Sequence, residues 1–256
     1  MRNRAENQIN LILIRHGETA SNSSGRYLGR TDEELSGDGK AKLLINQAAG
    51  RYPKAELVFS SPMKRCIQTS ELIYDCRSPI LIEEWREMDF GRFEGKNYQE
   101  LNGDTQYQAW IDSNGSLPFP EGESREQFAL RCQKGFRKLL GIIQQELQEK
   151  VRREVQQKVQ REVRREIQHE VQCQIKCEMQ LRMQQEAQQI WQEAQQREEI
   201  TLTAAAVIHG GSIMALLSAY CGGDYFDYRC KNGEGYLCCL KLKDSMEFKL
   251  TIIRKL

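Results

Sequence analysis

Short aliphatic runs alternate with helical stretches at both ends of the chain. The first run, Asn10–Ile14, reads as a buried strand and leads into a loop rich in Gly, Ser and Asn. The predicted strands are 10–14, 57–60, 80–82 and 204–208. Three helices are predicted: one over about 39–51, one that begins near Pro62 and one that begins at Ser124. Ser124 and Gln127 have the spacing of a capping box. Strands separated by helices predict an α/β fold, a three-layer α/β/α arrangement with a mostly parallel central sheet.

Residues 144–199 differ in pattern from both flanks. These 56 residues contain 17 Gln, 11 Glu and 10 Lys or Arg, without Gly, Pro, Asn, Asp, Ser or Thr. The composition favours helix, and apolar residues recur at every fourth position from Ile143 to Trp191. Such a repeat turns a helix by roughly 400° per step, so the apolar stripe drifts and an ordinary coiled coil is not predicted. We expect a long helical insertion, either a projecting hairpin that reverses near Cys173–Cys177 or a long helix that is partly disordered.

The predicted domain organisation follows from this contrast. Residues 1–143 and 200–256 are expected to form one α/β domain, and 144–199 to be an insertion within it. The insertion is also the predicted site of any self-association or protein partner. His169, Cys173 and Cys177 fall at i, i+4 and i+8 within it, which is a metal-ligand pattern, but no fourth ligand is evident. We interpret this spacing as a chance product of the repeat and predict no metal and no cofactor.

Charge and cysteine content exclude several classes of function. The chain has 37 basic and 36 acidic residues, a net charge of +1, so neither a nucleic acid nor a membrane surface is an expected partner. The apolar run Ile9–Ile14 is too short for a secretory or membrane-spanning segment. The nine cysteines are odd in number and contain no Cys-x-x-Cys, which favours a reducing, cytoplasmic location.

Two of the three histidines stand directly after apolar strands. His16 follows the first predicted strand and His209 follows the run 204–208, and each precedes a glycine. Ligands bind at the carboxyl ends of strands in open α/β sheets, so we expect both imidazoles in one site.

The same edge of the sheet is expected to receive the other groups that phosphate chemistry needs. An imidazole that is neutral at pH 7 can act as a nucleophile. Arg15 and Arg65 offer cationic donors for phosphate oxygens, and Glu87 offers an acid for the leaving group. No Asp/His cluster with metal-site spacing accompanies them, so a mechanism without metal is preferred.

Three motifs resemble those of the histidine phosphatase superfamily, also called phosphoglycerate-mutase-like. They are Leu-Ile-Arg-His-Gly-Glu-Thr at 13–19, Ser-Ser-Pro-Met-Lys-Arg at 60–65 and Ile-His-Gly-Gly at 208–211. The resemblance implies that His16 becomes phosphohistidine and that Glu87 first donates a proton and then activates water. The resemblance also implies a phosphate pocket formed by Arg15, Arg65, His209, Asn22 and the Gly210 N–H. It further implies that Arg26, Tyr27 and Gly29 lie at the pocket mouth, beside the organic part of the substrate.

The segments 86–95 and 120–124 are similar to the phosphatase branch of the superfamily, and most similar to α-ribazole phosphatases. That resemblance implies hydrolysis of a small-molecule phosphate monoester, α-ribazole 5′-phosphate in cobalamin biosynthesis. Three alternatives stay open: a broad-specificity histidine phosphatase, a phosphoglycerate mutase and, less favoured, a non-catalytic interaction platform.

Overall fold

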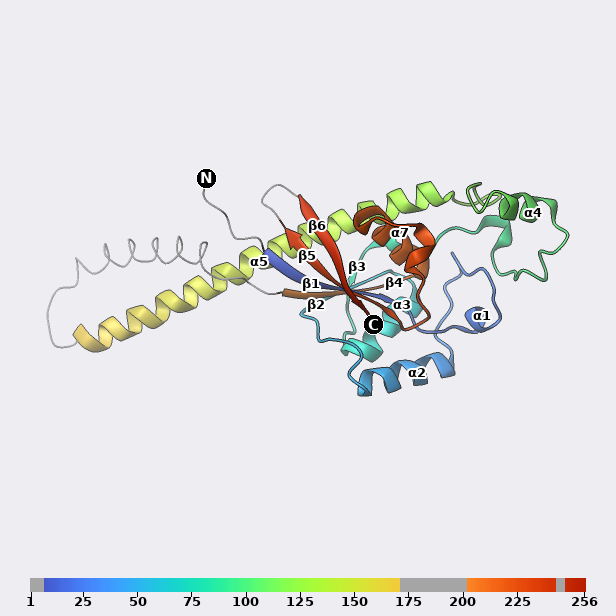
Figure 1. Cartoon of the computed structure of the whole chain (residues 1–256). Helices are drawn as coiled ribbons and strands as arrows, with labels where there is room; N and C mark the ends of the chain where they lie inside the picture. The colour runs from blue at the N-terminus through green and yellow to red at the C-terminus, as the bar shows by residue number, and fades with distance from the viewer. Residues whose placement is uncertain (1–6, 171–201, 243–246) are drawn as a thin grey trace.

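The computed structural model describes residues 7–170, 202–242 and 247–256, and its elements can be followed in Figure 1. The strands are β1 (Asn7–Arg15), β2 (Leu57–Ser60), β3 (Ile80–Leu81), β4 (Leu202–Ile208), β5 (Gly235–Leu242) and β6 (Phe248–Lys255). The helices are α1 (Ala20–Ser23), α2 (Gly37–Ala48), α3 (Lys64–Tyr74), α4 (Thr105–Asp112), α5 (Arg125–Glu170) and α7 (Gly210–Cys221). Short 3-10 turns cover η1 (Glu83–Trp85), η2 (Gly91–Phe93) and η3 (Tyr225–Tyr228).

The six strands form one sheet in the order β3-β2-β4-β1-β5-β6. β3, β2, β4 and β1 pair in parallel, whereas β5 runs antiparallel to both β1 and β6. Five strands therefore share one direction, which confirms the prediction of a mostly parallel sheet. β5 is the exception because only five residues separate it from β6, and so short a connection joins antiparallel neighbours.

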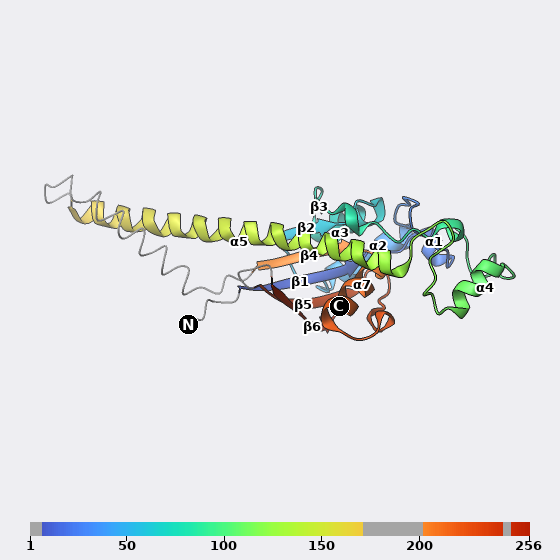
Figure 2. The same cartoon turned by 90° about the horizontal axis from the view of Figure 1, so that it is seen from above.

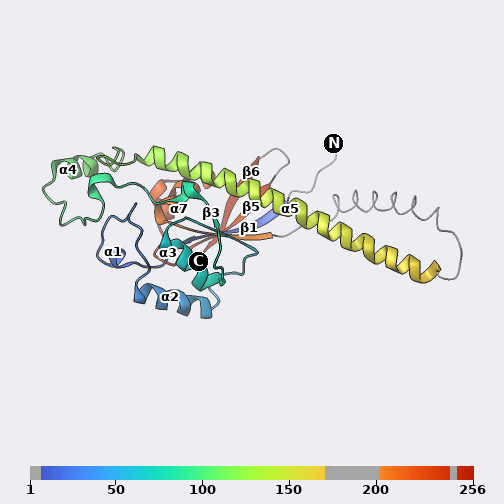
Figure 3. The same ribbon diagram turned by 180° about the vertical axis from the view of Figure 1, so that it is seen from behind.

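Helices cover both faces of the sheet, as Figures 1 and 3 show. Alternate residues of a strand point to opposite faces, and β1 follows this rule closely. Ile9, Leu11 and Leu13 pack into a core shared with α5 and α7. Ile12 and Ile14 pack into a second core shared with α2 and α3. The three-layer α/β/α prediction is therefore confirmed.

Helix α5 runs without interruption from the α/β domain into the Gln-rich repeat. It contains 46 residues, about 69 Å of helix at 1.5 Å per residue. Its start is capped as predicted: the Gln127 N–H donates to Ser124 Oγ at 3.1 Å and the Ser124 N–H donates to Gln127 Oε1 at 2.9 Å. Buried side chains from Phe128 to Leu147 attach its first half to the sheet, and Figure 2 shows the second half extending beyond it.

The predicted boundary at 143/144 lies inside this helix, so the change in composition does not coincide with a change in secondary structure. The division into a domain and an insertion, and a partner for that insertion, stay predictions. The reversal expected near Cys173–Cys177 lies outside the described residues, as does the side chain of His169. In the described parts of the chain, no helix combines the length and the apolar character that a bilayer span requires.

Candidate active site

The pairing of β1 with β4 brings His16 and His209 together. Arg15 pairs with Ile208 in register, and the His16 N–H donates to the Ile208 carbonyl at 2.9 Å. The two imidazole rings lie edge to face, with their centroids 5.2 Å apart and their planes at 67°. Both side chains are buried, so the two strand ends form the floor of one enclosed site.

The hydrogen bond of the His16 ring determines which nitrogen is free. Nδ1 lies 2.6 Å from the Gly17 carbonyl, which can only accept, so Nδ1 carries the proton and Nε2 keeps its lone pair. Burial holds the pKa of His16 well below its usual value, and the charges of Arg65 and Arg15 lower it further. His16 is therefore neutral at physiological pH, and the lone pair of its Nε2 is available for reaction.

His209 lies among polar side chains at the N-terminus of α7. Its Nε2 is 2.9 Å from Ser61 Oγ, and its Nδ1 is 3.8 Å from Glu87 Oε2. Burial lowers the pKa of His209 well below its usual value, and Arg65, His16 and Arg15 act in the same direction. A neutral His209 can donate one ring N–H to a ligand oxygen without adding a full charge to the site.

Arg15 and Arg65 place two guanidinium groups beside the histidines without a carboxylate partner. Arg65 is fully buried and donates to the carbonyls of Thr31 (2.9 Å) and Gly29 (3.1 Å), while Arg15 Nη1 donates to the Cys230 carbonyl at 2.9 Å. The Nε atoms of both arginines are buried and have no hydrogen-bond partner within the described structure. Neither arginine forms an ion pair with any described carboxylate. Buried cations without a counter-charge are costly, so this arrangement indicates a site built for an anion.

Glu87 occupies the opposite side of His209 from Ser61. Its side chain is 12% exposed, and burial raises its pKa above the usual value, partly offset by the Met88 N–H and by the nearby arginines. Glu87 Oε1 accepts the Met88 N–H at 2.9 Å, which holds the carboxyl in place. A carboxyl with a raised pKa keeps its proton to higher pH, as a general acid requires.

Helix α7 adds backbone donors to the same site. It begins at Gly210, directly after His209, and no side chain caps its first turn. The first N–H groups of a helix have no partner inside the helix, and together with the helix dipole they favour an anion. A Cβ on Gly210 would lie 3.3 Å from Arg15 Cδ, so glycine allows the helix end to approach the arginine closely.

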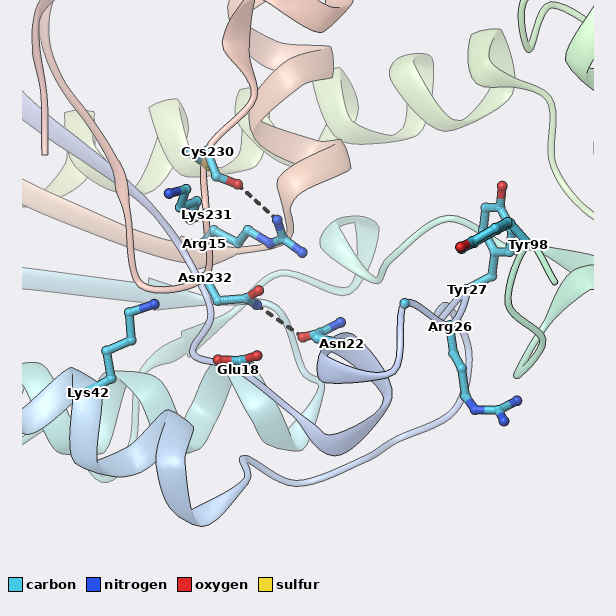
Figure 4. Close-up of a pocket in the computed structure, with 11 residues that line it drawn as sticks. Arg15, Glu18, Asn22, Arg26, Tyr27, Lys42, Tyr98, Cys230, Lys231 and Asn232 are labelled. Carbon is cyan, nitrogen blue, oxygen red and sulfur yellow. Dashed lines mark hydrogen bonds between the residues drawn. The ribbon is translucent and has the colours of Figure 1, made fainter.

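A cavity of about 680 Å³ opens from Arg15 toward the surface. Asn22, Arg26 and Tyr27 line it, and Figure 4 shows their arrangement. The Asn22 Oδ1 accepts from Asn232 Nδ2 at 3.0 Å, which leaves the Asn22 amide nitrogen as a donor. Arg26 is engaged by Glu100 through two bonds of 2.7 and 2.8 Å, so its charge is already compensated.

Gly29 is not among the residues that line this cavity, and its place at the pocket mouth stays a prediction. It is buried, and its N–H donates to the Glu94 carboxylate at 2.9 Å. Its carbonyl accepts from Arg65, so Gly29 helps to orient the Arg65 guanidinium. The reason for glycine is steric, because a Cβ would lie 2.1 Å from the Met88 carbonyl oxygen.

We expect Gly29→Ala to lower the free energy of unfolding by about 1–3 kcal/mol, because the Met88 backbone must move to admit the methyl group. Urea denaturation measures this change. Gly37→Ala is the matched control, since a Cβ there would meet nothing within 4 Å. An unchanged midpoint for Gly29→Ala would show that the two backbones do not approach so closely.

Sequence reasoning missed three side chains that contact the site. Ser61 holds His209, and Asn232 donates to the carbonyls of His16 and Gly17 at 3.2 Å as well as to Asn22. Arg131 on α5 binds the carbonyl of Glu87 at 3.3 Å. Ser61 lies inside a quoted motif and could have been found there. Asn232 and Arg131 carry no local signal.

Comparison with known proteins places the chain in a family. The model of the histidine phosphatase superfamily (branch 1) matches residues 11–146, more than half of the chain. This protein belongs to that superfamily. The match includes both arginines, His16 and Glu87, and ends before the strand that leads to His209.

Individual relatives share a third of their residues or fewer with this chain over the matched regions. Phosphoserine phosphatase 1 of Hydrogenobacter thermophilus is 33% identical over 134 residues, which cover 50% of this chain and 62% of that protein. A 2,3-bisphosphoglycerate-dependent phosphoglycerate mutase of Corynebacterium efficiens is 33% identical over 119 residues, 42% of this chain and 47% of the mutase. The matches thus span less than two thirds of these relatives. The crystal structure of the α-ribazole phosphatase from Shigella flexneri has a similar fold, with a TM-score of 0.59 over 95% of each chain at 20% identity.

Proposed function

We propose that this protein hydrolyses phosphate monoesters through a phosphohistidine on His16. Nε2 of His16 attacks phosphorus while the bond to the ester oxygen breaks, and Glu87 gives its proton to that leaving oxygen. Arg15, Arg65, His209 and the Gly210 N–H hold the other phosphate oxygens. Water then attacks the phosphohistidine, Glu87 takes the proton from that water, and inorganic phosphate leaves with His16 restored.

One observation carries this proposal. Two guanidinium groups with unpartnered buried N–H donors lie beside a neutral imidazole whose Nε2 is free. The donors match the spread of charge over phosphoryl oxygens in the transition state, and the free nitrogen supplies the nucleophile. Glu87, the carboxyl that lies 3.8 Å from His209, has the raised pKa that a proton donor needs.

We expect the hydrolysis to continue in EDTA, with kcat/KM within about 2-fold of the untreated value. The physical reason is that Arg15 and Arg65 supply the positive charge that stabilises the transferring phosphoryl group. Steady-state rates before and after chelation and dialysis measure the effect. Loss of turnover in EDTA, restored by a divalent cation, would contradict the mechanism.

For the substrate we propose α-ribazole 5′-phosphate. Support comes from the resemblance of segments 86–95 and 120–124 to α-ribazole phosphatases and from the aromatic side of the cavity. Tyr27 and Tyr98 lie on one side of Arg15 in Figure 4, where they offer ring surfaces to the heterocyclic base.

The other side of the cavity favours a second candidate. Lys42 and Lys231 lie across Arg15 from the two tyrosines, and neither forms an ion pair with a carboxylate in the described part of the chain. Two free ammonium groups favour a monoester that also carries a carboxylate, such as phosphoserine or 3-phosphoglycerate.

The experiment that separates these candidates is a comparison of kcat/KM for α-ribazole 5′-phosphate, phosphoserine and 3-phosphoglycerate. Phosphate release distinguishes hydrolysis from phosphoryl transfer within phosphoglycerate. A preference of at least ~10-fold for α-ribazole 5′-phosphate, about 1.4 kcal/mol in transition-state binding, would support the first candidate. A preference of that size for a carboxylated monoester, lost on Lys42→Met, would support the second.

A further inference from the structure

An ion pair lies directly beside the segment that carries Glu87. Arg131 Nε lies 2.9 Å from Glu123 Oε1, and Arg131 Nη2 lies 2.6 Å from Glu123 Oε2. The side chains are only 26% and 22% exposed. Arg131 comes from the second turn of α5, and Glu123 from the turn that precedes this helix. The pair thus ties the second turn of α5 to the turn that precedes this helix.

Arg131 uses all five of its N–H donors, and three of them bind backbone carbonyls around Glu87. Nη1 donates to the carbonyls of Glu84 and Arg86, both at 2.9 Å, and Nη2 donates to the carbonyl of Glu87 at 3.3 Å. A planar guanidinium fixes its acceptors in one geometry, which a flexible ammonium group does not do. The backbone before and at Glu87 is therefore held by a single side chain.

Glu123 holds the backbone on the other side of Glu87. Its Oε2 accepts the Asp89 N–H at 3.0 Å, and its own N–H donates to the Asp89 carbonyl at 3.0 Å. Together, Glu123 and Arg131 fix the chain two residues after Glu87, at Glu87 and three residues before it. The carboxyl of Glu87 itself is held by the Met88 N–H within this clamped segment.

The ion pair between Arg131 and Glu123 also affects the protonation of Glu87. Glu87 already faces Arg15 from β1 and Arg65 from α3, with the buried His209 at 3.8 Å. A third free guanidinium would favour the ionised carboxylate and remove the proton that Glu87 must donate. The carboxylate of Glu123 compensates the charge of Arg131, so the arginine can anchor the backbone with less effect on the protonation of Glu87.

We propose that Arg131, paired with Glu123, is a positioning residue that holds the Glu87 carboxyl where it can protonate the leaving oxygen. This inference rests on the proposed function. It assigns a role to the turn 120–124, whose resemblance to the phosphatase branch carried no mechanism of its own. Arg131 acts through Glu87 and has no contact with the phosphate site through its own donors, all of which are already used.

The test compares Arg131→Met in the wild-type background and in a Glu87→Gln background. We expect Arg131→Met to lower kcat for an alkyl phosphate by about 10-fold or more, with KM changed less than about 2-fold. With nitrophenyl phosphate, whose leaving group barely needs a proton, the loss should stay below about 3-fold. In Glu87→Gln, adding Arg131→Met should cause no further loss, because the two changes act on one proton transfer.

Equal losses on both substrates, or the same loss in the Glu87→Gln background, would show a merely structural role and overturn the inference. Arg125→Met is the matched control and should leave the substrate ratio unchanged. Arg125 is the first residue of α5, takes no part in the clamp and lies over the rings of Tyr225 and Phe226. Glu123→Gln tests the same clamp if Arg131→Met does not fold, and should give the same substrate dependence with a smaller loss. Failure of the proposed function is distinguishable, because the wild-type protein would then hydrolyse neither substrate.

Discussion

Replacing His16 with alanine is expected to lower kcat for phosphate monoesters by at least ~10⁴-fold, because it removes the nucleophile. His209 does not take its place, because its ring centroid lies 5.2 Å from that of His16 and its Nε2 lies 2.9 Å from Ser61 Oγ. The fold should survive, since alanine keeps the β1 backbone and its bond to the Ile208 carbonyl. Circular dichroism would verify that the variant is folded before its rates are measured.

The phosphoenzyme provides the direct measurement for His16→Ala. Rapid acid-free quenching after mixing with labelled substrate should trap acid-labile phosphate on the wild-type protein and none on the variant. The third histidine supplies the matched control, because His169→Ala lies in the Gln-rich repeat and should keep the wild-type labelling. An acid-labile phosphoenzyme that still forms without His16 would refute the assignment.

The sequence was sufficient to predict the floor of the site because the parallel sheet converts strand ends into neighbours. His16, Arg65 and His209 each follow a strand or open the helix after one, and β1, β2 and β4 are adjacent. Their distances along the chain are large, but the register of parallel strands places their carboxyl ends at one edge. A polar residue directly after an apolar strand run therefore indicates where that residue lies in the folded protein.

Other parts of the site depend on contacts that no local pattern records. Asn232 reaches the end of β1 because β5 runs antiparallel to β1 and starts beside it, with Gly235 paired to Ile14. Gly29 is buried because the backbone at Met88 crosses it, which a sequence cannot show. The change in composition at 143/144 does not end α5, because helix-forming residues stand on both sides of it.

The second large effect is expected for Glu87→Gln. The amide keeps the shape and hydrogen bonds of the carboxyl but cannot transfer a proton, so kcat for alkyl phosphates should fall by about 10²–10³-fold. With nitrophenyl phosphate the loss should be smaller, within about 10-fold, because the leaving group needs little protonation. Glu83→Gln is the matched control, since Glu83 is an exposed carboxylate nearby that pairs with Arg86 at 2.9 Å. Equal losses on both substrates would exclude Glu87 as the acid.

The pH dependence gives the same assignment a second, independent test. The wild-type kcat/KM for alkyl phosphates should decline as pH rises through the raised pKa of Glu87, because the carboxyl then loses the proton that it must donate. It should decline on the acid side only as pH falls through the lowered pKa of His16, because protonation removes the lone pair of Nε2. Glu87→Gln should abolish the alkaline decline and leave the acid one, since only the carboxyl has been replaced. If the alkaline decline persists in Glu87→Gln, another group supplies the proton, and the clamp formed by Arg131 and Glu123 then has no acid to position.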